Sequence, residues 1–292
     1  MPHPLSITRR HVLKTAALSV LAAPFLGRTP IHAAEAPVKN SDGREHGLRL
    51  GVASYSTRML SLDETIATLG VLRISNAGLY KAHCNWETAT TDECRAVAEK
   101  LKAAGIALTG SGVVNLPNDE AKVRKAFENV RAAGMATMVC KPELAALPLV
   151  EKFVKEFDQR LAIHNHGPED KFYPSPADVW KAVQPFDARI GLCLDVGHAM
   201  RAGADPAASI RQYAARLYDV HLKDSLAISG AIQDIPVEIG AGRIDTRGIL
   251  RALLEIKYSG VVAFEYEKVG GNPVTGLAES IGYVRGMLAA QQ

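Results

Sequence analysis

The stretches RLAIHNHGPED at residues 160–170, RIGLCLDVGH at 189–198 and LYDVHLKD at 217–224 decide the fold. Each contains a short run rich in Leu, Ile and Val, followed by charged or imidazole side chains. Runs of this length predict buried strands, and the amphipathic segments between them have the length of crossover helices. If the three strands are parallel neighbours in one sheet, their polar ends meet at its carboxyl-terminal edge.

The same alternation of strand and helix patterns runs from residue 48 to the end of the chain. Further strands are expected at 48–54, 71–79, 106–113, 136–141 and 260–266. Helices are expected at 92–104, 119–133, 147–157, 176–184, 206–215, 245–257 and 273–290, with another opening at Ser61. Eight strand–helix units in about 245 residues predict the α/β class, as a single-domain (β/α)8 TIM barrel over residues 48–292.

An open doubly wound sheet is the structural alternative to the barrel. The first strand is followed by SYSTRML at residues 54–60, which lacks the glycine-rich turn that nucleotide binding requires. The longest interval without a strand or helix pattern is 225–243, between the last two predicted strands. A loop of this length on the active face of a barrel is often a lid or a substrate wall.

Residues 1–36 resemble a twin-arginine export signal. A pair of arginines at 9–10 precedes an apolar stretch at 16–26, and a region of small residues follows at 32–36. This order predicts a cleavable signal, a linker at 37–47 and a periplasmic barrel. An amphipathic first helix is one alternative and a membrane anchor is another, although the apolar stretch is too short to span a bilayer.

Composition argues against several classes of protein. The chain has 292 residues, of which 47% are hydrophobic and 22% charged, as in an ordinary globular protein. The formal net charge is only +3 and no basic run is interleaved with aromatic residues, so nucleic acid is not an expected partner. The four cysteines lack CxxC spacing and fit buried thiols better than a disulfide framework. No stable membrane anchor is expected.

Four successive predicted strands, the fifth to the eighth, end in a side chain that can bind a metal ion. They are His164, Asp195, His221 and Glu265. Adjacent strands lie about 4.8 Å apart, so four neighbouring strand ends can direct their side chains at one ion. Imidazole and carboxylate donors that converge from separate elements are typical of a metal site. The alternative is coincidence, with Asp195 capping a turn and Glu265 solvated.

At these residues the chain resembles the sugar phosphate isomerase/epimerase family, which belongs to the xylose isomerase-like TIM barrels of the AP endonuclease family 2 superfamily. The matching pieces are LCLDVGH at 192–198, DVHLKD at 219–224 and VEIGAGRIDTRGILRALLEIKYSGVVAFEYE at 237–267. The resemblance implies a divalent metal ion bound by Asp195, His221 and Glu265. The fourth position departs from the family pattern, because His164 stands where members usually have a glutamate.

This departure shapes the expected chemistry. The resemblance implies a sugar isomerase or epimerase, in which Glu265 or His164 takes a proton next to a carbonyl and an enediolate forms. Two imidazoles and two carboxylates favour Mn, Co or Zn over Mg. The alternatives are a 3-keto-glycoside lyase that acts by β-elimination at the same site, and a sugar-binding barrel without catalysis. An endonuclease is disfavoured by the weak basic charge.

Further polar side chains surround the predicted centre. His198 is a candidate catalytic group, because it can hydrogen-bond the substrate or donate a proton. The candidate substrate-binding residues are Lys223, Lys141, His166, Glu238 and His83. Lys223 is expected to point inward, two residues after His221 on the same strand face. A surface position for Lys141 and a structural role for His83 are equally compatible with the sequence. The expected partner is a small sugar, and the sequence is compatible with a homodimer.

Overall fold

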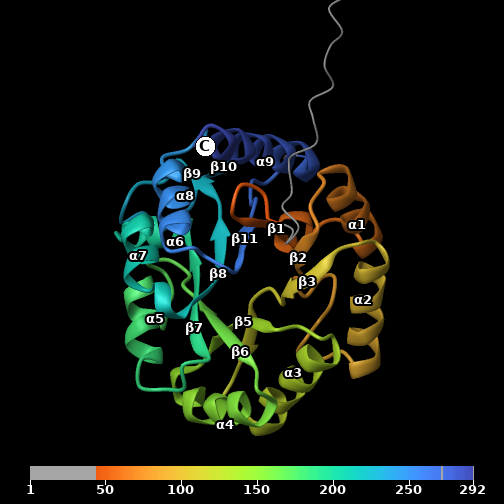
Figure 1. The fold of residues 1–292 in the computed structure, drawn as a ribbon. Helices are drawn as coiled ribbons and strands as arrows, with labels where there is room; N and C mark the ends of the chain where they lie inside the picture. Colours follow the sequence, from red (N-terminus) through yellow and green to blue (C-terminus); the bar gives the residue numbers. More distant parts are fainter. Residues whose placement is uncertain (1–43, 271, 292) are drawn as a thin grey trace, which may run out of the picture. The chain divides into compact units, whose positions relative to one another are not determined.

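The computed structural model describes residues 44–270 and 272–291, and the predicted export signal at 1–36 lies outside them. The apolar runs form strands that pair in parallel around a barrel, and the helices form a ring outside them (Figure 1). The strand order is β3-β2-β1-β11-β8-β7-β6-β5-β4, so the last barrel strand pairs with the first. The predicted α/β TIM-barrel class is therefore confirmed.

The barrel strands are β1 (Arg49–Ala53), β2 (Asn76–Gly78), β3 (Ala107–Gly110), β4 (Val114–Leu116), β5 (Thr137–Pro142), β6 (Arg160–His164), β7 (Ile190–Asp195), β8 (Leu217–Leu222) and β11 (Val261–Phe264). The helices are α1 (Leu62–Val71), α2 (Thr91–Ala103), α3 (Glu120–Ala132), α4 (Leu147–Phe157), α5 (Pro176–Val183), α6 (Val196–Arg201), α7 (Pro206–Gln212), α8 (Thr246–Glu255) and α9 (Pro273–Ala289). Short 3-10 turns occur at Ser54–Thr57, Leu144–Ala146 and Ala214–Arg216.

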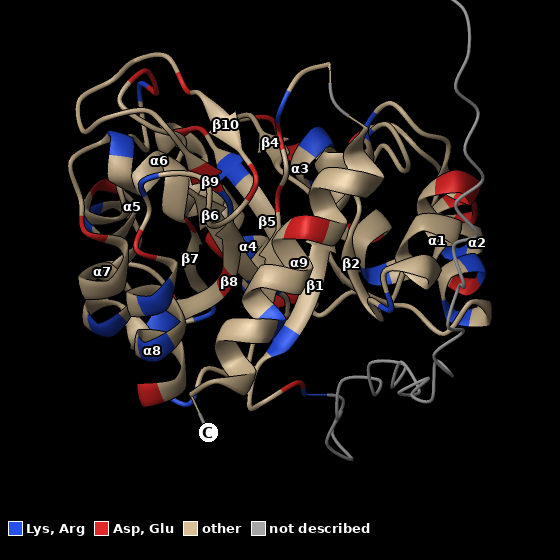
Figure 2. Cartoon of the chain, turned by 90° about the horizontal axis from the view of Figure 1, so that it is seen from above, with Lys and Arg blue, Asp and Glu red and all other residues tan. Residues whose placement is uncertain are grey.

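The helix starts follow local capping chemistry. Ser61 and Thr90 each accept a hydrogen bond from the backbone of a glutamate three residues later, and that glutamate bonds back to the cap. Such capping boxes satisfy backbone donors that a helix start leaves unpaired. Charged residues gather on the outward side of helices such as α2 and α8 (Figure 2). Within the described part of the chain, no helix is long and apolar enough to span a membrane.

The second strand is shorter than the sequence pattern indicates. Helix α1 continues to Val71 and Arg73 adopts a left-handed φ of 55°, so the strand predicted at 71–79 is reduced to Asn76–Gly78. The Asn76 side chain donates to the Leu50 carbonyl at 2.9 Å and ties the short strand to β1. A polar residue that weakens the strand pattern thus supplies a link to the neighbouring strand.

The strand predicted at 106–113 ends early, at Gly110, and a separate strand, β4, follows at 114–116, beyond the predicted range. β3 pairs with β2, and β4 pairs with β5. Between them Ser111 donates to the Val139 carbonyl at 2.9 Å. Gly112 has a φ of 61°, and a Cβ atom there would lie 2.8 Å from Tyr80 Cα, so the bend requires glycine.

Two elements near the site differ from the prediction. The strand predicted at 189–196 ends at Asp195, and the six residues that follow form α6, which the sequence pattern did not indicate. The long interval at 225–243 carries an antiparallel ribbon of β9 (Asp224–Ser225) and β10 (Pro236–Val237). Both segments border the carboxyl-terminal edge of the sheet.

Candidate metal centre

The four predicted donors lie on the inner face of the barrel, because side chains alternate between the two faces of a strand. Ala162 and Cys193 pack against Val139 in a small cluster separate from the main core. His164 and Asp195 lie two residues further along the same strands and therefore share that face. In the sheet register, Asp195 lies opposite His221.

The donor atoms converge. His164 Nε2 lies 3.2 Å from His221 Nδ1 and 3.4 Å from Asp195 Oδ2. His221 Nδ1 lies 3.3 Å from Glu265 Oε2, and the donor atoms of all four residues lie within 4.8 Å of one another. Such spacings suit one ion about 2.0–2.2 Å from each donor. The buried set His164, Asp195, His221 and Glu265 is therefore a candidate metal site.

Three of the four donors have protonation states that suit a bound cation. Burial alone would raise the pKa of Asp195 and of Glu265, but the Lys223 ammonium holds both pKa values well below the usual range. Both carboxylates are therefore ionised. Burial lowers the pKa of His164, so its ring is neutral and offers a lone pair. His221 differs: burial alone would lower its pKa, but Cys193 and Glu265 beside it raise the pKa well above the usual range, so its ring must give up a proton to bind an ion. Asp195 Oδ2 is buried and faces the other donors and the Lys223 ammonium, so a cation bound there would compete with Lys223 for this oxygen.

Lys223 is buried among carboxylates. Its Nζ lies 2.8 Å from Asp195 Oδ2 and 2.8 Å from Glu265 Oε2, and it also contacts Glu267. The side chain points inward, and its ammonium balances the negative charge of the cluster. Because it contacts three carboxylates, Lys223 belongs to the electrostatic environment of the donors as much as to a substrate pocket.

Asn165 connects the ends of β6 and β7. Its amide nitrogen donates to the Asp195 carbonyl at 3.0 Å, and its amide oxygen accepts from the Asp195 backbone nitrogen at 2.9 Å. The carboxylate of Asp195 also caps α6, because its Oδ1 accepts from the His198 backbone nitrogen at 2.8 Å. These bonds fix Asp195 in place through both its backbone and its side chain.

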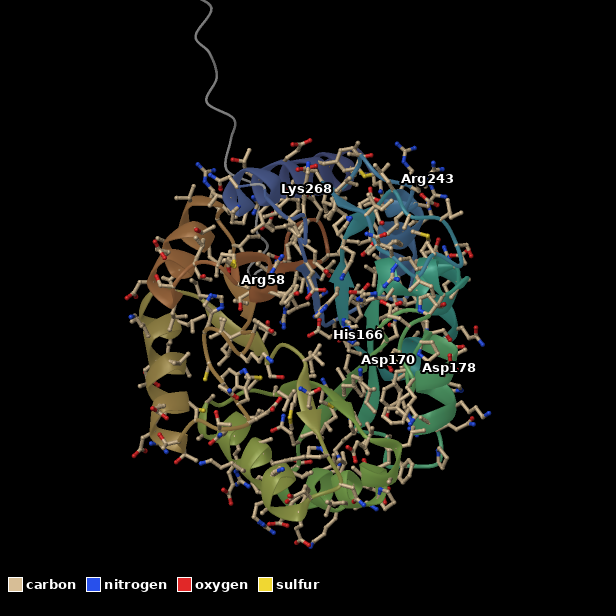
Figure 3. The ribbon with its side chains drawn as sticks, turned by 180° about the vertical axis from the view of Figure 1, so that it is seen from behind. Arg58, His166, Asp170, Asp178, Arg243 and Lys268 are labelled. Carbon is tan, nitrogen blue, oxygen red and sulfur yellow. The ribbon has the colours of Figure 1, made fainter. Side chains whose placement is uncertain are left out.

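An open cavity of about 410 Å³ reaches the cluster. This volume lies within the range of roughly 300–1,000 Å³ that is usual for small-molecule sites. Of the predicted residues, His164, Glu265, His198, His166 and Lys141 line it. Figure 3 shows His166 directed towards the middle of the barrel, with Arg243 at the outer edge.

Two of these lining residues have distinct environments. Burial lowers the pKa of His166 to about 4, so its ring is neutral. Lys141 pairs with Asp170, whose carboxylate also accepts from the backbone nitrogens of Phe172 and Tyr173. Lys141 is thus held at the cavity wall and is not a free surface lysine.

The structure places three of the substrate-binding candidates, Lys223, His83 and Glu238, outside the lining of this cavity. His83 is buried, with its ring nitrogens 2.8 Å from Ser54 Oγ and 3.0 Å from the Leu60 carbonyl, which is the structural position weighed above. Glu238 accepts from the Tyr266 hydroxyl at 2.7 Å and from Lys268 at 2.9 Å. In this structure it holds the irregular segment that follows β11.

Sequence reasoning missed several lining residues. Glu267, Arg201, Glu169, Tyr55 and Tyr80 all line the cavity. Glu267 had a signal in the sequence, because it continues the inward alternation of Ala263 and Glu265. Arg201 and Glu169 had none, since their place at the site depends on how α6 and the loop after β6 pack together.

Comparisons with known proteins agree with this architecture. The sequence model of a family described as the xylose isomerase-like TIM barrel matches residues 145–287. Among solved structures, L-ribulose 3-epimerase has 16% identity and a TM-score of 0.67, covering 83% of this chain and 95% of its own. The 3-keto-D-glucoside 4-epimerase from E. coli has 13% identity and a TM-score of 0.64, covering 82% of this chain and 99% of its own.

A third structure, the IOLI protein with a bound zinc atom, has 16% identity and a TM-score of 0.66, covering 84% of this chain and 97% of its own. No curated protein matches the chain by sequence. At these identities the likeness to solved structures establishes the fold alone. The activity has to be inferred from the residues of the site.

Proposed function

Because residues 145–287 belong to the xylose isomerase-like TIM barrel family, we propose that this chain is a divalent-metal-dependent sugar isomerase or epimerase. The observation that carries the proposal is the convergence of His164, Asp195, His221 and Glu265 at the end of an open cavity. Sugar epimerases among the fold neighbours support the substrate class by analogy.

In this proposal the four converging side chains hold one divalent ion, with Zn, Mn or Co preferred because two donors are imidazoles. When bound, the cation polarises a carbonyl group and makes the neighbouring C–H acidic. Glu265 lines the cavity and is the group that takes this proton. The Lys223 ammonium beside it keeps the carboxylate ionised and ready to accept.

His164 occupies the position from which a second group can deliver a proton. It is buried, neutral and 3.4 Å from Asp195, and it lines the same cavity as Glu265. If Glu265 returns the same proton to the neighbouring carbon, the product is an isomer. Delivery of a proton to the opposite face of the first carbon gives an epimer, and for this step His164 must first take up a proton from solvent while Glu265 keeps the one it removed. Lys141, His166 and His198, which surround the cavity, are placed to bind substrate oxygens.

The test combines metal analysis with isotope exchange. Protein purified without chelator is analysed for bound metal, then incubated with ketoses in deuterated water and followed by NMR. We expect one equivalent of a transition metal and exchange at the carbon next to the carbonyl. The variant E265Q should lose exchange by roughly 10²–10⁴-fold, as for loss of a general base. The matched control E99Q, on the outer face of α2, should keep it.

Two outcomes would contradict this reading. If the barrel binds sugars without any metal and without exchange, it is a binding protein. If E265Q exchanges as fast as the unsubstituted chain, Glu265 is not the base.

A second candidate function, a 3-keto-glycoside lyase, is favoured because Glu265 is the one glutamate among the four converging donors. With His164 in place of the usual second glutamate, Glu265 can remove the proton while the group on the β-carbon leaves with its bonding electrons. An imidazole can then give a proton to the departing oxygen. Release of the aglycone from a 3-keto-glycoside, without return of deuterium to the sugar, distinguishes this reaction from epimerisation.

We also propose that the protein acts in the periplasm. The proposal rests on the sequence of residues 1–36, with its paired arginines, apolar stretch and small-residue region. Replacing the arginine pair at 9–10 by lysines should retain the precursor in the cytoplasm, as cell fractionation would detect. A chain that keeps its first 36 residues and stays cytoplasmic without any substitution would contradict it. Assembly as a homodimer stays a prediction, which light scattering can test.

A further inference from the structure

Arg201 is a buried arginine at the wall of the cavity. It ends α6, has only 1% of its surface exposed, and lines the cavity together with His198. An arginine is almost never buried without partners, because its guanidinium stays charged. The groups that its guanidinium contacts therefore indicate the role of Arg201.

The guanidinium holds three segments together. Both of its terminal nitrogens donate to the Glu169 carboxylate, at 2.7 and 2.9 Å, from the loop after β6. One of them also donates to the carbonyls of Ala231 and Ile232 in the long loop, at 3.1 and 2.6 Å. The other lies 2.7 Å from Nδ1 of His198.

The last contact constrains the protons of His198. A guanidinium has only donors, so the ring nitrogen that it approaches must accept. If Nδ1 of His198 carried a proton, two N–H groups would face each other across 2.7 Å. The arrangement therefore requires a neutral ring whose proton is on Nε2.

The protonated nitrogen is left for a ligand. The His198 ring lines the cavity, and its centroid lies 5.0 Å from that of His166 and 5.7 Å from that of His164. Within residues 44–270 and 272–291, no hydrogen bond to Nε2 of His198 is found. A neutral ring with Nε2–H can donate a hydrogen bond into the cavity but cannot accept a proton there.

We infer that Arg201 is a positioning residue that locks His198 as a hydrogen-bond donor to a substrate oxygen. The group it recognises is an oxygen that gains negative charge, such as the carbonyl oxygen next to the carbon that loses its proton. This part rests on the proposed sugar chemistry, whereas the tautomer of His198 does not. His198 is thereby excluded as a base at this cavity, and the proton transfers are left to Glu265 and His164.

The first test measures the tautomer directly, without substrate. The full chain is labelled with ¹⁵N-histidine, and long-range ¹H–¹⁵N spectra are recorded with and without Zn²⁺. The His198 signals are assigned by their loss in the variant H198Q. We expect the unprotonated, pyridine-type shift at Nδ1 and the protonated, pyrrole-type shift at Nε2. A protonated Nδ1 in the unsubstituted chain would overturn the inference, whatever the activity.

Variants separate the role of Arg201 from simple loop anchoring. R201M should let part of the His198 population carry its proton on Nδ1, while R201K, which keeps one cationic donor, should restore the original pattern. R243M is the matched control, because the exposed Arg243 anchors the same loop through the Leu226 carbonyl and does not reach His198. If R201M and R243M leave the His198 spectrum equally unchanged, Arg201 does not set the tautomer.

Kinetics then tests the donor role. The amide of H198Q can place an N–H near the original Nε2, so kcat/KM should fall by no more than about 10-fold. H198A removes the donor and should lose roughly 10²–10³-fold, mainly in kcat. Equal losses in both variants would overturn the donor role. If the unsubstituted chain shows no exchange with any sugar, the proposed function fails while the tautomer measurement still stands.

Discussion

His164 is the residue by which this site differs from a metal site that has two glutamates among its donors. Its imidazole stands at the end of β6, 3.2 Å from His221 and 3.4 Å from Asp195, so it enters the donor set directly. Two imidazole donors make the site softer than one built from carboxylates alone. The identity of this one side chain thus bears on both the preferred ion and the number of carboxylates that can move a proton.

The variant H164E tests whether His164 determines which metal ion the site prefers. A third carboxylate in the cluster should shift the binding preference from Zn or Co towards Mn and Mg, because oxygen donors suit harder cations. Competition titrations of Zn²⁺ against Mn²⁺, followed by calorimetry, would measure the shift. An unchanged Zn/Mn preference would mean that His164 does not contact the ion.

Asp219 gives a pH-dependent prediction. It is 5% exposed on β8, and burial raises its pKa from 3.8 to about 6. Because the folded pKa is the higher one, this group's contribution to stability is present at low pH and is lost as the pH rises through about 6. The isosteric variant D219N should therefore be more stable than the unsubstituted chain at pH 8, by up to about 3 kcal/mol.

The stability gain of D219N should shrink as the pH falls from about 6 to below 3.8, where the carboxyl is protonated in both the folded and the unfolded state. Urea unfolding in the presence of EDTA, at a series of pH values, measures the difference without a contribution from bound metal. A gain that stays constant across this range would assign the effect to packing and not to ionisation.

At the scale of elements, the carboxylate of Asp224 organises the loop that follows the ribbon. It is 1% exposed and accepts from the backbone nitrogens of Ser225, Gly240, Gly242 and Ile244, at 2.8 to 3.1 Å. A Cβ atom on Gly242 would lie 2.0 Å from the carboxylate, so glycine is required for this close approach. The two sequence pieces DVHLKD and VEIGAGRID are thus halves of one interaction.

Removing this carboxylate should therefore release the loop. D224A leaves four backbone donors without their acceptor, of which those of Ser225 and Ile244 are buried, and should cost about 3 kcal/mol. Loss of an ordinary helix cap in D245A should cost about 1 kcal/mol. Chemical denaturation measures both losses, and limited proteolysis shows whether cleavage moves into residues 225–243. Equal losses in the two variants would show that Asp224 acts as a simple cap.

The sequence predicted those elements whose pattern is local. Each of the apolar runs that contain His164, Asp195 and His221 forms a strand, and successive side chains of a strand point to opposite faces. The strands and the inward direction of these three donors could therefore be predicted from the sequence. Helix α6 was not predicted because six residues are too few to show a helical period. The place of Arg201 at the site was not predicted for a different reason. It joins three segments that are distant in sequence, and no spacing rule connects them.

At the scale of the whole molecule, the donor set joins four barrel strands at one end of the sheet. His164, Asp195 and His221 come from β6, β7 and β8, and Glu265 follows β11. An ion bound by all four would add a further link between strands that are already joined by their backbone ladders and by the contacts of Asn165 and Lys223. Metal binding should consequently stabilise the whole barrel and not one loop.

Thermal unfolding tests this linkage. At a metal concentration about 100 times the dissociation constant, binding should add about 2.7 kcal/mol, which corresponds to roughly 5–10 °C in Tm for a domain of this size. EDTA should reverse the rise, and D195N should abolish it. A Tm that ignores Zn²⁺, Mn²⁺ and Co²⁺ alike would argue that the cluster binds no ion in the folded chain.

The split between β3 and β4 has a consequence for how the barrel can change in evolution. Around the remaining circumference, widening the mouth would break a continuous ladder, whereas at 111–113 the ladder is already interrupted and a serine hydroxyl bridges the gap. Gly112 and Val113 line the cavity at this point. Substrate size can therefore be altered by replacing a few residues at this interruption, on the side of the barrel away from β6, β7 and β8, while the ion-binding chemistry is inherited intact.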